Sequence, residues 1–175
     1  MKKIITIIVF LLLTLETYAD KLEIYNNTNY NLSYNLTTYA LNGNPYPYLQ
    51  TSGASTLVTL NAWGTAIYNN GIYGSFPFYS PGTTPLINTW ARTIAAGIPS
   101  TNTPSNIAQN LYGTTQALGK FKFVFDGTPF SANIGEPGHA DFEYIYDSAN
   151  TNILIQYFSY NDTTTGETIY YILAD

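Results

Sequence analysis

A two-residue alternation of apolar and polar side chains recurs along this chain and limits the fold more than any other feature. In the segment 120–125, three phenylalanines alternate with Lys120, Lys122 and Val124, and in the segment 30–37 tyrosine or leucine occupies every second position. Because successive side chains of a β-strand point to opposite faces, this period predicts strands with one face in a core and the other in solvent.

The alternating or continuous apolar segments are short, which indicates a fold built almost entirely from strands. We expect strands at residues 22–25, 30–37, 55–60, 120–125, 140–146, 152–160 and 168–173. Long stretches rich in Gly, Pro, Asn and Thr separate them, at residues 42–53, 61–85 and 97–103. The sequence therefore predicts an all-β protein, a single antiparallel β-sandwich with long aromatic-rich loops and at most one or two short helices.

One short helix is expected after residue 102. Thr103 is a residue type that caps helices, and Pro104 suits the first helical position because its missing N–H would have no partner there. Ile107 and Leu111 are four residues apart and share one face, and Gly113 can end the helix.

The first nineteen residues have the pattern of an export signal. Two lysines precede a ten-residue apolar run at 4–13, and Thr17 and Ala19 stand at the −3 and −1 positions of a cleavage site. A signal this short and led by lysines is typical of bacteria. We therefore expect residues 1–19 to be a signal peptide, residues 20–175 to form a single domain, and the protein to be secreted or periplasmic. No later stretch has the roughly 18 apolar residues of a transmembrane helix.

The composition excludes several classes of function. After residue 19 the chain has four cations (Lys21, Arg92, Lys120 and Lys122) against ten acidic residues, a formal charge of −6. Four scattered cations cannot form the basic surface that nucleic acid requires. The chain has no cysteine and one histidine, which excludes thiol chemistry, disulfides and a histidine-rich zinc site.

The segment GEPGHADFEYIYD, residues 135–147, contains that histidine and four of the acidic residues, and its candidate site residues are Glu136, His139, Asp141 and Glu143. On a strand, the last three would project to one side, opposite Ala140, Phe142, Tyr144 and Tyr146. The favoured interpretation is a solvent-facing strand beside an aromatic core face. Two alternatives are a cation site, with calcium as the cofactor, and a general acid–base pair formed by Asp141 and Glu143.

Aromatic side chains gather in the predicted loops of the first half of the chain. Six of them are candidates for ligand binding: Tyr46, Tyr48, Trp63, Tyr68, Tyr73 and Trp90. Their rings have flat apolar faces, and a tyrosine hydroxyl or tryptophan N–H adds a polar group, a combination suited to stacking on sugars, peptides or a membrane interface. The alternative is that these rings pack in the sandwich and its loops.

Four functions remain open on this basis. The leading hypothesis is a secreted, non-enzymatic β-sandwich that binds a surface ligand, a carbohydrate for example, through its loop aromatics; its partner would be a surface glycan, protein or membrane component. The alternatives are a membrane-active, toxin-like β protein, a carboxylate-based hydrolase, and a subunit of a surface fibre with an exposed sheet edge at its N-terminal strand. The segment Leu-Glu-Ile-Tyr-Asn-Asn at 22–27 resembles the first strand of aegerolysin-like haemolysins. That resemblance covers one strand, so no functional residue is carried over.

Overall fold

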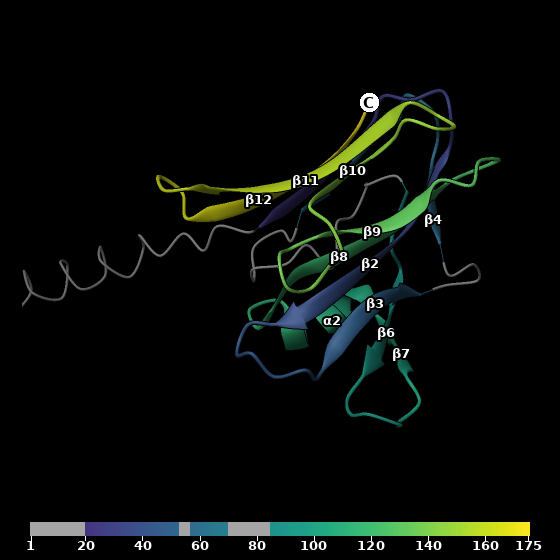
Figure 1. Ribbon diagram of the computed structural model, residues 1–175. Helices are drawn as coiled ribbons and strands as arrows, with labels where there is room; N and C mark the ends of the chain where they lie inside the picture. Colours follow the sequence, from purple (N-terminus) through teal and green to yellow (C-terminus); the bar gives the residue numbers. More distant parts are fainter. Residues whose placement is uncertain (1–19, 53–56, 70–84) are drawn as a thin grey trace, which may run out of the picture.

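The computed structural model describes residues 20–52, 57–69 and 85–175, which form two β-sheets packed against each other (Figure 1). The first sheet has five strands in the order β10 (Tyr144–Asp147), β11 (Ile153–Asp162), β12 (Glu167–Ala174), β1 (Lys21–Asn26) and β5 (Thr65–Asn69). The second has the order β7 (Thr101–Pro104), β6 (Thr89–Thr93), β3 (Tyr48–Ser52), β2 (Leu32–Ala40), β8 (Gln116–Phe125) and β9 (Ser131–Gly135), with β4 (Val58–Leu60) also paired to β2. The predicted all-β sandwich is confirmed.

One pair of strands departs from the predicted antiparallel arrangement. β1 and β12 lie side by side and run parallel, with Leu22 opposite Tyr170 and Ile24 opposite Ile172. Parallel neighbours cannot be joined by a short hairpin, and here almost the whole described chain separates the two strands. Local spacing in the sequence gives no signal for such a pair.

The hydrophobic core lies between the two sheets and follows the alternation. Phe121, Phe123 and Phe125 of β8 are buried, whereas Lys122 is exposed, as the sequence predicts. The hydroxyl groups of Tyr34 in β2 and Tyr68 in β5 are 2.7 Å apart, so a hydrogen bond joins the two sheets inside the core. Since Tyr68 donates its hydrogen to the Pro85 carbonyl oxygen, Tyr34 is the donor in this pair. Burial raises the pKa of Tyr34 well above its ordinary value.

The helix α2 (Ser105–Tyr112) confirms the predicted helix, with two differences in detail. Pro104 precedes the helix as its N-cap, and Thr103 belongs to β7 and does not cap it. The face that Ile107 and Leu111 share is exposed, because the helix turns Ser105 and Ala108 inward, toward β6 and β7. Among the described residues, no helix is long and apolar enough to cross a membrane.

Candidate functional site

A cleft of about 620 Å³ opens where β2 ends and β3 begins. It is lined by the end of β2, the β2–β3 loop, the start of β3, the middle of β8 and one residue of the β9–β10 loop: Thr37, Thr38, Tyr39, Ala40, Leu41, Gly43, Asn44, Pro45, Tyr48, Gln50, Gly119, Lys120 and His139. We call it the Tyr39 cleft. Its floor is β-sheet with one irregularity in the pairing of β2 with β8, and strands hold the lining side chains more rigidly than loops would.

Two glycines allow this floor to form. The register of β2 and β8 shifts between Thr37 and Thr38, so Gly119 is an extra residue on β8. A Cβ atom on Gly119 would lie 3.0 Å from Cδ1 of Tyr39 and 3.4 Å from Cβ of His139. A Cβ atom on Gly135, where φ is 151°, would lie 2.4 Å from the Gly119 carbonyl oxygen. The rings of Tyr39 and His139 can therefore lie this close to the backbone of β8 only because Gly119 has no side chain. The backbones of β8 and β9 can approach each other at Gly135 for the same reason.

The rings of Tyr39 and His139 stack within the cleft. Their centroids are 3.8 Å apart and the ring planes meet at 16°. Burial raises the pKa of Tyr39, and the negative charge of Glu136 adds to the effect, so the hydroxyl stays protonated at neutral pH. The pair therefore contributes stacked aromatic rings and a neutral hydroxyl group to the cleft lining.

Polar side chains stand beside these rings on three adjacent strands. In the register of the sheet, Thr37 of β2 is opposite Gln50 of β3 on one side and opposite Lys120 of β8 on the other. Residues paired across strands project to the same face of a sheet. An amide, a hydroxyl and an ammonium group therefore form one row across the cleft floor, and all three can hydrogen-bond a polar ligand.

Tyr48, one of the aromatic residues predicted to bind a ligand, lines the cleft. Its ring lies 5.9 Å from that of Tyr46, between centroids, and the peptide bond from Tyr46 to Pro47 is cis. The Pro47 carbonyl oxygen accepts a hydrogen bond of 3.0 Å from Gln116. This bond ties the turn that carries both tyrosines to the start of β8.

The other predicted aromatics are not in the cleft. Trp63 is 67% exposed, has a left-handed backbone (φ 57°), and donates from Nε1 to Asn29, at the opposite end of β2. Tyr68 and Trp90, which were also predicted to bind a ligand, have side chains buried in the core and away from solvent. Tyr73 lies outside the described residues.

The four residues predicted to bind a metal are dispersed. His139 is in the Tyr39 cleft. Glu136 accepts a hydrogen bond of 2.7 Å from the Tyr157 hydroxyl, and Asp141 accepts one of 2.7 Å from Asn133. Glu143 lines a separate hollow of about 450 Å³ together with Glu136. Within residues 20–52, 57–69 and 85–175, no three His, Asp or Glu side chains come together as a metal site.

The strand predicted at 140–146 is shorter than expected, and its faces are reversed. Only Tyr144–Asp147 forms β10, because residues 136–143 turn along the edge of β9, where the Gly135 N–H donates to the Phe142 carbonyl oxygen. Ile145 packs on the core, whereas Tyr144 and Tyr146 are exposed. His139, Asp141 and Glu143 therefore do not share a strand face.

The reversed faces of β10 place Tyr144 and Tyr146 on the outer side of the five-stranded sheet. Phe158 and Tyr160 of the neighbouring strand β11 are exposed on the same side, and Phe158 stacks on Tyr171 at 4.8 Å between centroids. We call this surface the aromatic face.

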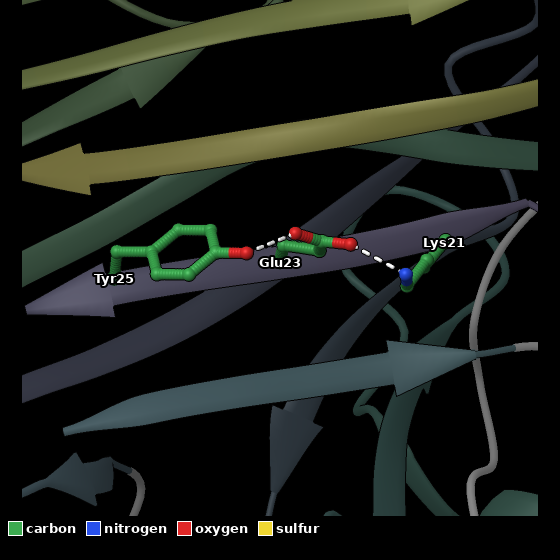
Figure 2. A network of polar contacts seen from close by, with 3 residues as sticks. All are labelled: Lys21, Glu23 and Tyr25. Carbon is green, nitrogen blue, oxygen red and sulfur yellow. Dashed lines mark hydrogen bonds and ion pairs between the residues drawn. The ribbon is translucent and has the colours of Figure 1, made fainter.

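The same side of β1 carries a short polar network (Figure 2): Glu23 forms an ion pair with Lys21 and accepts a hydrogen bond from Tyr25. Burial favours the neutral form of Glu23, but these two partners outweigh it and lower the pKa of Glu23. The hydrogen bond to Glu23 raises the pKa of Tyr25 to about 12. The charges of Lys21 and Glu23 are thus neutralised within the network.

Comparison with models of known protein families, with curated proteins and with solved structures finds no match. The site therefore rests on its own geometry. Sequence reasoning missed Tyr39, Gln50 and Lys120 as site residues. The available signal was their position: Tyr39 is out of phase with the alternating run that ends at Leu36, which places it on the opposite face of the strand, and Lys120 is one of only four cations after residue 19.

Proposed function

We propose that this protein is an exported, non-enzymatic binding protein that holds carbohydrate in the Tyr39 cleft. The observation that carries the proposal is the combination in one cleft of a stacked ring pair, Tyr39 and His139, with the polar row of Gln50, Thr37 and Lys120. Sugar rings have apolar faces that stack on aromatic rings and hydroxyl groups that need hydrogen-bond partners. Export is inferred from the pattern of residues 1–19.

Affinity electrophoresis in gels containing soluble polysaccharides tests this function. A retarding polymer identifies a ligand, and Tyr48→Ala should then weaken its binding about tenfold, since a lost aromatic contact and its buried area are worth roughly 1–2 kcal/mol. Tyr160→Ala is the matched control, because it removes an exposed tyrosine from the aromatic face and leaves the cleft intact. If no neutral or acidic polysaccharide retards the protein, or if Tyr160→Ala alone weakens binding, the cleft is not a carbohydrate site.

A second candidate is a membrane-active β protein, which the aromatic face favours. Tyr144, Phe158 and Tyr160 are large exposed rings on one sheet surface, and rings with polar edges favour a membrane–water interface. Sedimentation with vesicles of zwitterionic lipid, together with dye release, separates this function from the first. Binding that Tyr160→Ala abolishes and Tyr48→Ala leaves unchanged would support it, and an absence of binding would remove it.

A further inference from the structure

The distribution of positive charge narrows the class of ligand that suits the Tyr39 cleft. Residues 20–175 contain four cations and ten acids, so a cation inside a cleft is unusual for this chain. Lys120 lines the cleft, and Lys122 lies two residues further along the same face of β8. Two of the four cations therefore stand on one strand, about 6–7 Å apart along it.

The other two cations already have partners. Lys21 forms an ion pair with Glu23, and Arg92 donates from Nη1 to the Tyr112 hydroxyl at 3.0 Å. In the described part of the chain, no carboxylate lies within ion-pairing distance of the Lys120 ammonium. The charge of Glu136 acts on Tyr39, but the Glu136 carboxylate is itself hydrogen-bonded to Tyr157 of the other sheet.

The Lys120 ammonium group has no ion-pair partner among the described residues and lines the same cleft as the aromatic pair. This combination suits a sugar that carries an anionic group. A neutral sugar needs the stacked rings and the hydrogen-bonding groups but gains little from a full positive charge. A uronate or sulfated sugar can pack its ring against the stacked pair of Tyr39 and His139 and place its anionic group on Lys120, where charge-assisted hydrogen bonds are stronger than neutral ones. The net negative charge of the chain opposes non-specific association with acidic polymers.

We propose that the Tyr39 cleft selects anionic glycans, with Lys120 as the residue that binds the carboxylate or sulfate group. This inference rests on the proposed carbohydrate function and specifies its ligand class. The recognition is by a single ammonium group within the cleft lining, so it predicts dependence on Lys120 itself and not on the net charge of the protein.

Two pairs of polymers that differ in charge test the inference by affinity electrophoresis. Polygalacturonate is compared with its methyl ester, which keeps the backbone and removes the carboxylate charge, and dextran sulfate is compared with dextran. We expect tighter binding to the anionic member of at least one pair. The pair that responds identifies the anionic group as carboxylate or sulfate.

Two variants then separate a positioned contact from general electrostatics. Lys120→Gln should weaken binding to the anionic polymer by about 10-fold to 100-fold, because hydrogen bonds to charged groups are worth roughly 1.5–3 kcal/mol. Lys122→Gln removes the same charge from the same strand, two residues outside the cleft lining, and should change binding less than threefold. Unchanged thermal melting of both variants would show that the fold is intact.

The results distinguish failure of this inference from failure of the carbohydrate function. Equal binding to the charged and uncharged members, or an equal loss in the two lysine variants, overturns selection by Lys120 and leaves the carbohydrate function standing. Binding to neutral polysaccharides alone also overturns selection by Lys120. If no polysaccharide binds, both proposals are overturned.

Discussion

Asp20 provides a test of whether the described packing governs stability, because its carboxyl group is buried at the start of β1. It is 5% exposed, and one of its oxygens accepts a hydrogen bond of 2.9 Å from the Thr168 backbone N–H. Burial raises the pKa of Asp20 from 3.8 to about 6, and the charge of Glu167 adds to this, against the opposing hydrogen bonds to Thr168. The perturbation is Asp20→Asn, which keeps an oxygen for the Thr168 N–H.

The direction of the effect follows from linkage. Because the pKa is higher in the folded state than in the unfolded state, the folded state binds the proton more tightly. The stability contributed by Asp20 is therefore complete below about pH 3.8 and is lost as the pH rises to about 6. At 1.36 kcal/mol per unit, the shift corresponds to at most about 3 kcal/mol, and we expect about 1–2 kcal/mol because Asp20 lies at the end of a strand, where local relaxation and solvent screening reduce the effect.

The assay is urea unfolding of the wild type and Asp20→Asn at pH 4 and pH 8, in a chain that keeps Ala19 ahead of Asp20 so that no terminal ammonium group intervenes. We expect similar free energies of unfolding at pH 4 and a variant more stable by about 1–2 kcal/mol at pH 8. Asp162→Asn is the control of opposite sign, since backbone hydrogen bonds from Thr164 and Thr165 lower the pKa of Asp162. A difference between wild type and Asp20→Asn that is the same at both pH values would refute the reasoning.

Two further predictions test the core and the cleft floor. Trp90→Ala should lower the free energy of unfolding by about 3–5 kcal/mol because Trp90 is fully buried, whereas Trp63→Ala should change it by less than about 0.5 kcal/mol; equal losses in chemical denaturation would contradict the burial of Trp90. Gly135→Ala should destabilise the protein by about 2 kcal/mol or more, because its Cβ atom would overlap the backbone of Gly119. A melting temperature within about 1 °C of the wild type would show that the two strands do not approach as described.

The candidate site was only partly predictable from local sequence. The aromatic and histidine signals identified Tyr48 and His139, which the structure brings into one cleft. They did so for different reasons, however, since Tyr48 was predicted to bind a ligand and His139 a metal ion. Nothing in their spacing, 91 residues apart, indicates that they meet. Their position in one cleft depends on the pairing of β2 with β3 and with β8 and on the turn of the β9–β10 loop.

The sequence by itself determined the all-β class, the burial of the Phe121–Phe125 face and the position of the short helix. Each of these follows from a local period, because the pleat of a strand and the turn of a helix repeat over a few residues. The tertiary structure alone decided the parallel pairing of β1 with β12, the burial of Tyr68 and Trp90, and the reversal of residues 140–147. A period of two residues defines the two faces of a strand. When both faces carry apolar side chains, the period does not say which face packs against the other sheet, and only long-range packing decides it.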